Sequence, residues 1–130
     1  MLADLKPWRA AFAGPKSGTQ IRKALQLAPR NPRVLLLDAI ADQERPMASA
    51  EDRERAFGKL KKAVAAFEAE RQGIDQVPGW GAAEAYTFLA RSCLDRGDMV
   101  AARDAVERAL LIAPEFAQAR RLMTQIINSG

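Results

Sequence analysis

The sequence contains no histidine, and it has a single cysteine among its 130 residues. Histidine is the commonest general base and metal ligand, so its absence leaves serine and threonine nucleophiles without their usual base. Cys93 alone can form neither an intramolecular disulfide nor a cysteine metal cluster. Because it falls on an apolar stripe, we expect it to be a small buried hydrophobe. These absences predict a protein that is not an enzyme, with no catalytic residues, no metal ligands and no cofactor.

Long apolar runs are also missing. No stretch approaches the roughly 18 apolar residues that cross a bilayer. Residues 1–13 contain Asp4, Lys6, Pro7 and Arg9 instead of the uninterrupted apolar core of a secretory signal. We therefore expect a cytoplasmic location as the default. The composition, 48% hydrophobic and 28% charged, is ordinary for a globular chain of one domain.

The net charge of +4 is spread unevenly along the chain. Residues 1–36 contain Asp4 as their only acidic residue, and we interpret this basic N-terminal pole as a solvated face. Its alternative use is attraction of an acidic peptide, an anionic lipid surface or nucleic acid, although no aromatic residues are interleaved for base stacking. The basic residues of the pole are Lys6, Arg9, Lys16, Arg22, Lys23, Arg30 and Arg33.

Two helical patterns face each other between residues 83 and 116. Gly97 can adopt the left-handed conformation that ends a helix, Asp98 can cap the next helix, and Pro114 prevents its continuation. Apolar residues recur at spacings of three and four, which predicts a helix hairpin with small residues along its seam. The stripes consist of Tyr86, Leu89, Ala90, Cys93 and Leu94 on the first helix and of Ala102, Val106, Ala109, Leu110 and Ala113 on the second.

This stretch resembles the tetratricopeptide repeat, a hairpin of 34 residues with aromatic, small and proline residues at fixed places. The matching positions are Tyr86, Leu89, Ala90, Cys93, Ala102, Val106, Ala109 and Pro114, and Cys93 and Val106 stand where the family has aromatic residues. The resemblance implies an all-α fold, a short right-handed solenoid of helical hairpins with about seven helices. It also implies a non-catalytic scaffold or adaptor that binds another protein or a peptide in a concave groove.

The remaining chain is divided by comparison with this regular repeat. A single domain is expected, with a truncated repeat over 1–31, an extended repeat over 32–82, the regular repeat over 83–116 and a capping helix over 117–130. Helices are predicted over 4–13, over 17–28, from Pro32 onward, over 49–72 and after Phe116. Ser49 with Asp52 resembles a capping box at the start of the longest helix. Lys59, Lys61 and Lys62 on that helix are expected to form a solvated face.

In proteins of the resembled family the first helix of each repeat lines the groove. Arg91 and Arg121 could hold an acidic group there by forked hydrogen bonds. Trp80 lies in a turn-rich loop and is expected to pack into the helix junction, or otherwise to be an exposed anchor for a partner. The groove positions carried over to this sequence are Arg33, Leu36, Ile40, Gln43, Glu84, Thr87, Arg91, Asp95, Gln118, Arg121 and Gln125.

Two further features leave alternatives open. Asp38 and Asp42 are four residues apart on one helix, where a carboxylate pair can hold a cation or act as acid and base, but no third ligand has a useful spacing and we interpret the pair as structural. The helix from Pro32 is apolar nearly all round. Self-assembly into a homo-oligomer is therefore the second function class, whereas nucleic acid and membranes are not the partners that we expect.

Overall fold

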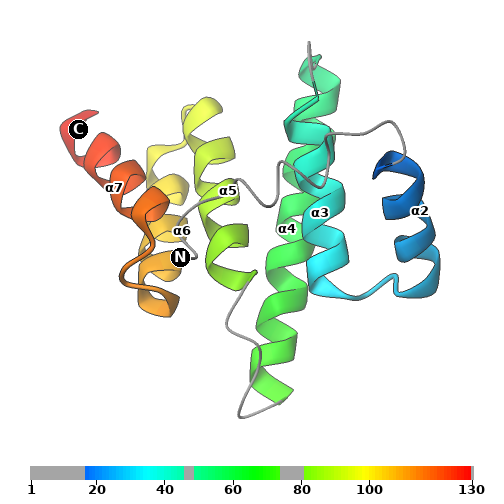
Figure 1. The fold of residues 1–130 in the computed structure, drawn as a ribbon. Helices are drawn as coiled ribbons and strands as arrows, with labels where there is room; N and C mark the ends of the chain where they lie inside the picture. Colours follow the sequence, from blue (N-terminus) through cyan, green and yellow to red (C-terminus); the bar gives the residue numbers. More distant parts are fainter. Residues whose placement is uncertain (1–16, 46–48, 74–80, 130) are drawn as a thin grey trace. The chain divides into compact units, whose positions relative to one another are not determined.

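The computed structural model describes residues 17–45, 49–73 and 81–129, and all regular structure in these ranges is α-helical (Figure 1). The all-α prediction is thus confirmed for the described residues. The helix expected over 4–13 and the anchor candidate Trp80 lie outside them. The six helices in the described ranges are α2 (Ser17–Leu27), α3 (Pro32–Gln43), α4 (Ala50–Gly73), α5 (Ala82–Asp95), α6 (Met99–Ile112) and α7 (Ala117–Ser129).

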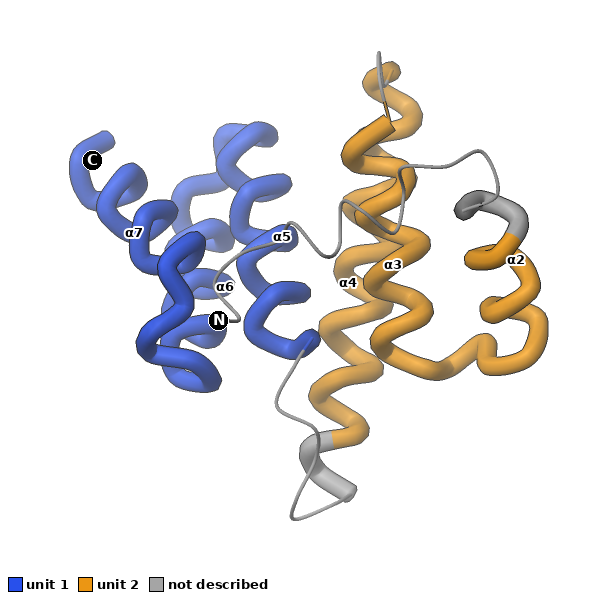
Figure 2. Tube along the Cα trace, viewed as in Figure 1, with its two compact units in different colours: residues 1–4, 79–130 blue, residues 5–78 orange. Residues whose placement is uncertain are grey.

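The chain forms two compact units, which Figure 2 shows in different colours. Residues 5–78 form one unit, in which α3 packs against α4 and α2 packs against α3. Residues 1–4 and 79–130 form the other, in which α6 packs against α5 and α7, and α5 also contacts α7. Within the described ranges, no helix is both long and apolar enough to cross a membrane.

The start of α3 is fixed by two neighbouring residues. The Asn31 side-chain oxygen accepts hydrogen bonds from the backbone N–H groups of Arg33 at 2.9 Å and Val34 at 3.3 Å. Pro32 occupies the first helical position, where a backbone N–H would have no partner within the helix, so the lack of one in proline costs no hydrogen bond. Local sequence therefore supplies the cap of this helix.

The start of α4 is the predicted capping box. The Asp52 N–H donates to Ser49 Oγ at 3.0 Å, and the Ser49 N–H donates to Asp52 Oδ2 at 3.0 Å. From this cap the helix runs 24 residues and presents a buried row at spacings of three and four. The buried residues of the α3 and α4 pair are Leu36, Ala39 and Ile40 on α3 and Ala56, Leu60, Ala63 and Phe67 on α4.

The turn between α5 and α6 has the predicted chemistry. Gly97 adopts a φ of 81°, its N–H donates to the Leu94 carbonyl at 2.9 Å, and the Asp98 N–H donates to the Cys93 carbonyl at 2.9 Å. This pair of bonds is a Schellman motif, which satisfies carbonyl groups at the helix end. Asp98 then caps α6, because its Oδ1 accepts from the Ala101 N–H at 3.1 Å.

Small residues line the interior of the unit that contains α5, α6 and α7. Ala90, Ala102 and Ala109 have no exposed surface, as expected of a seam where two helix backbones approach closely. Cys93 is buried, in agreement with its predicted role as a small hydrophobe. Helix α7 buries Ala119, Leu122 and Ile126, while Ile127 is 60% exposed.

Candidate functional site

The residues predicted to line a groove on α5 divide into two groups. Glu84 and Thr87 are buried and bonded within the helix: Glu84 Oε1 accepts from the Gly81 N–H at 2.9 Å, and Thr87 Oγ1 donates to the Ala83 carbonyl at 2.7 Å. Arg91 is half-buried, and Asp95 is exposed in the last turn. The second half of α5 is therefore the part of the helix where these polar side chains reach solvent.

The groove residues predicted on α7 are exposed or half-buried. Gln118 is half-buried, and Arg121 and Gln125 are exposed. Their spacings of three and four place them on one face of the helix. Since α5 and α7 contact each other within one unit, the structure brings Arg91 and Asp95 into the same unit as these α7 residues.

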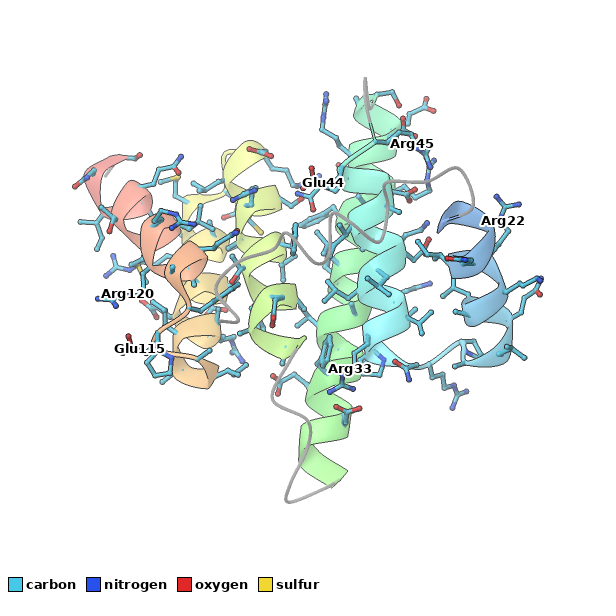
Figure 3. The ribbon with its side chains drawn as sticks, viewed as in Figure 1. Arg22, Arg33, Glu44, Arg45, Glu115 and Arg120 are labelled. Atoms are coloured by element: carbon cyan, nitrogen blue, oxygen red, sulfur yellow. The ribbon has the colours of Figure 1, made fainter. Side chains whose placement is uncertain are left out.

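Arg91 and Arg121 differ from their arginine neighbours in how they are bonded. On α6, Arg103 pairs with Glu107 and Arg108 pairs with Asp104, each at 3.2 Å. On α7, Arg120 lies 3.6 Å from Glu115, and Figure 3 labels both residues. Over residues 17–45, 49–73 and 81–129, no ion pair of the structure includes Arg91 or Arg121. Their guanidinium groups thus keep their hydrogen-bonding capacity for a ligand.

The groove positions on α3 belong to the other unit and have different surroundings. Leu36 and Ile40 are buried with 0% and 1% of their surface exposed. Gln43 is half-buried, and its side-chain oxygen has no hydrogen-bond partner among the described residues. Of these positions, Gln43 and Arg33 are the ones that retain accessible surface in the structure.

Arg33 is held by α4. Its Nη1 and Nη2 atoms donate to Glu70 Oε2 at 3.0 Å and Oε1 at 3.1 Å, which is a forked ion pair. The guanidinium also stacks over the Phe67 ring, with 5.3 Å between Cζ and the ring centroid. Glu70 of α4 is therefore a partner of α3.

A cluster of charges at the other end of the α3 and α4 pair was not predicted from the sequence. Asp42 Oδ1 accepts from Arg45 Nη2 at 3.0 Å and Asp42 Oδ2 from Arg55 Nε at 3.4 Å. Asp52 Oδ1 lies 3.5 Å from Arg45 Nη1 and also pairs with Arg55 Nη2. Asp42, Arg45, Asp52 and Arg55 therefore form a closed ring of alternating charge, which we call the charge ring.

Lys59 joins the charge ring to Asp38. Its Nζ lies 2.7 Å from Asp42 Oδ2 and 3.0 Å from Asp38 Oδ1. The prediction that Lys59 belongs to a solvated face is wrong, because it pairs with both carboxylates of α3. Lys59 lies one helical turn from Arg55, so both side chains lie on the same face of α4. Lys61 and Lys62 are exposed as expected. In the sequence, Asp38 and Asp42 are four residues apart, and so are Arg55 and Lys59. These two spacings were the available sign that two acidic residues on one helix could pair with two basic residues on the next.

The environment of these charges shifts three pKa values, and the hydrogen bond to Asp52 is the main cause that raises the pKa of Arg55. Burial lowers the pKa of the Lys59 ammonium, but hydrogen bonds to Asp42 and Asp38 outweigh this effect and hold it above its ordinary value of 10.5. The Ser49 backbone N–H, followed by the Ser49 side chain and Arg55, holds the pKa of Asp52 below its ordinary value of 3.8. All three shifts favour the charged forms.

The structure assigns the Asp38 and Asp42 carboxylates to ion pairing. Asp42 is 4% exposed and its two oxygens already accept bonds from three cations. Within the described part of the chain, no group of three histidine, cysteine or acidic residues has the geometry to hold a metal ion. Asp42 therefore lacks the free oxygens that a cation site or a general base needs, and the Asp38 carboxylate pairs with Lys59 through Oδ1.

Comparison of this chain with protein-family models, with curated proteins and with solved structures finds no match. The resemblance to the tetratricopeptide repeat stays a prediction from the residues between 83 and 116.

Proposed function

We propose that this protein is a non-catalytic interaction module that holds an acidic segment of a partner protein against the exposed residues of α5 and α7. The proposal includes a short right-handed solenoid of tetratricopeptide-like hairpins. It is supported by one observation above all: Arg91 and Arg121 stand outside the ion pairs of the described residues, while Arg103, Arg108 and Arg120 of the same unit are paired.

The chemistry of the binding follows from the arginine side chain. A guanidinium group can donate two parallel hydrogen bonds to one carboxylate, which fixes both the position and the plane of the ligand. Gln118 and Gln125 offer neutral donors and acceptors beside Arg121, and Asp95 limits the net positive charge. This mixture favours a peptide with one or two acidic residues among polar ones over a uniformly anionic polymer.

The test uses the full chain and an array of short peptides that differ only in whether they carry aspartate and glutamate or their amides. We expect the acidic peptides to be retained and the Arg91→Ala, Arg121→Ala double variant to bind them at least about tenfold more weakly, since two charged hydrogen-bonding groups are lost. The control is the Arg103→Ala, Arg108→Ala double variant, which removes the same charge from α6. Equal retention of acidic and amide peptides, or equal weakening in both variants, contradicts the proposal.

A second candidate function is binding of an anionic surface through α2. Gln20, Arg22, Lys23, Gln26 and Leu27 are exposed, whereas Ile21, Ala24, Leu25 and Ala28 are half-buried, so the helix has one basic outward face. No acidic residue occurs between 17 and 37 to neutralise it. Steeply salt-dependent binding to anionic vesicles or to DNA, lost in an Arg22→Gln, Lys23→Gln, Arg30→Gln variant, is the expected result. Absence of binding at low salt excludes this function.

Self-assembly was suggested by the apolar character of α3. In the structure Leu36, Ala39 and Ile40 are buried and Val34, Leu35 and Leu37 are half-buried, so this helix has no large exposed apolar side chain to offer a second copy. Sedimentation at several concentrations tests the oligomeric state directly. A monomer throughout eliminates the self-assembly class.

A further inference from the structure

A cavity of about 380 Å³ lies among α2, α3 and α4, within the unit of residues 5–78. Ile21 and Leu25 of α2 and Ala41 of α3 form its apolar wall. Arg22 lines it from α2, and the charged wall opposite contains Asp38, Asp42, Arg45, Arg55 and Lys59. A cavity of this volume falls in the range of small-molecule sites, which combine an apolar lining with a few fixed polar groups.

The Asp42 carboxylate of the charged wall already uses both of its oxygens. Asp42 accepts bonds from Arg45, Arg55 and Lys59, and only 6% of its side chain is exposed. Lys59, which also binds Asp38, is 29% exposed. In contrast, half of the Arg45 side chain and 47% of the Arg55 side chain remain exposed. The wall therefore presents the exposed N–H donors of Arg45 and Arg55, whereas Asp42 is already bonded and 20% of the Asp38 side chain is exposed.

The balance of charge around the cavity is positive. Four basic side chains line it against the two carboxylates of Asp38 and Asp42, and the additional carboxylate of Asp52 in the charge ring still leaves a net charge of +1. A cation entering this space meets repulsion, whereas an anion meets arginine donors held in place by their acidic partners.

We infer that this cavity is a binding site for a small organic anion that carries one carboxylate on an apolar body. The carboxylate binds the exposed donors of Arg45 and Arg55, and the apolar body packs against Ile21, Leu25 and Ala41. This site is separate from the peptide-binding face proposed on α5 and α7, because every residue that lines it belongs to the other unit.

The first test varies the charge of the ligand and leaves the protein unchanged. The probes are 4-phenylbutyrate, 4-phenylbutylamine with the same apolar body and the opposite charge, and acetate with the carboxylate alone. Titration followed by backbone amide NMR should show saturable binding of 4-phenylbutyrate, with shifts at Leu25, Ala41 and Arg55, and binding of each other probe at least about tenfold weaker. Binding of the amine as tight as the acid, or shifts located away from the cavity, overturns the inference, as does a lack of 4-phenylbutyrate binding at millimolar concentration.

The second test uses two variants with different chemistry. Ala41→Phe fills the apolar wall and keeps every charge, and Arg55→Gln removes one donor and leaves Asp42 with Arg45 and Lys59. Both should weaken 4-phenylbutyrate binding about tenfold or more. The control is Arg108→Gln, an exposed arginine paired on α6 in the other unit, which should bind as the unmodified chain does. Unchanged affinity in Ala41→Phe with an intact helical circular dichroism spectrum contradicts the assignment of the site.

Discussion

Arg33 and Glu70 form a forked ion pair between α3 and α4 although 37 positions separate them in the sequence. Their side chains are 14% and 21% exposed, so the pair is shielded from solvent more than the pairs on α6. Figure 3 shows Arg33 and Arg45 at opposite ends of the α3 and α4 pair. These two helices are thus joined by charged groups at both ends and by apolar residues between them.

The Arg33 and Glu70 pair should contribute measurably to stability. We expect Arg33→Ala to lower the free energy of unfolding by about 2 kcal/mol, because a partly buried carboxylate loses two charged hydrogen bonds. Urea denaturation of Arg33→Ala, Glu70→Ala and the double variant gives the coupling energy of the pair. Arg33→Lys should recover only part of the loss, since lysine keeps the charge and lacks the fork. Additive effects of the two alanine substitutions contradict this account.

Asp42 should be the most sensitive charged position of the α3 and α4 pair. Asp42→Asn keeps the shape of the side chain but leaves Arg45, Arg55 and Lys59 without their common buried carboxylate. We expect a loss of about 2–4 kcal/mol, below the full value for a buried pair because the two arginines are half exposed. The matched control is Glu44→Gln, an exposed position two residues away, whose unfolding midpoint should not move. A loss as small as that of the control shows that the charge ring does not stabilise the fold.

The pKa of Asp52 should depend on Ser49. The Ser49 backbone N–H makes the largest contribution to the lowered pKa and the Ser49 side chain the next, so Ser49→Ala should raise the value part of the way toward 3.8. Carboxyl carbon NMR measures this directly. Ser129→Ala, which removes a hydroxyl bonded to the Gln125 carbonyl, is the control and should leave the pKa unchanged.

The same shift has a consequence for stability against acid. Since the pKa of Asp52 in the folded state lies below that in the unfolded state, the stabilisation is complete above about 3.8 and is lost as the pH falls through the folded value. The difference in unfolding free energy between the unmodified chain and Ser49→Ala should therefore become smaller as the pH falls below about 3.8. A difference that does not change with pH contradicts the link between the cap and the carboxylate charge.

Two glycines should respond in opposite directions to the same substitution. Gly97→Ala places a side chain on a residue with a φ of 81° and should cost about 1–2 kcal/mol from backbone strain alone, because no atom lies within 4 Å of the added carbon. Gly58→Ala, in the middle of α4 and equally unobstructed, should stabilise by about 0.5–1 kcal/mol. Thermal denaturation of both variants shows whether each substitution raises or lowers the stability. Stabilisation by Gly97→Ala shows that the turn does not require the left-handed conformation.

The helices were largely predictable from the sequence because their ends are encoded locally. The Ser49 and Asp52 box and Gly97 with Asp98 each act within four residues, and α4 begins at Ala50 while α5 ends at Asp95 and α6 begins at Met99. The helix predicted over 17–28 ends at Leu27. The apolar rows followed from periodicity for the same reason. Ala90, Ala102 and Ala109 were expected in a seam and are fully buried.

The candidate sites could be predicted only in part. Whether Glu84 and Thr87 face a partner or are buried depends on packing that spacing does not reveal. Arg33 with Glu70, and Lys59 with Asp42, pair across two helices, so nothing in the local sequence of either residue indicates its partner. A row of charged residues along a helix predicts a solvated face. The prediction fails where the helix packed against it places residues of opposite charge beside that row.

The charge ring also restricts which substitutions related sequences can carry. Within the ring each of the four members pairs with two members of opposite sign, so reversal of one charge places it beside two like charges. A tolerated change must therefore alter acidic and basic members together. Among descendants of a common ancestor, positions 42, 45, 52 and 55 should covary as a group of four, while the singly paired Arg103 and Glu107 should vary as a couple.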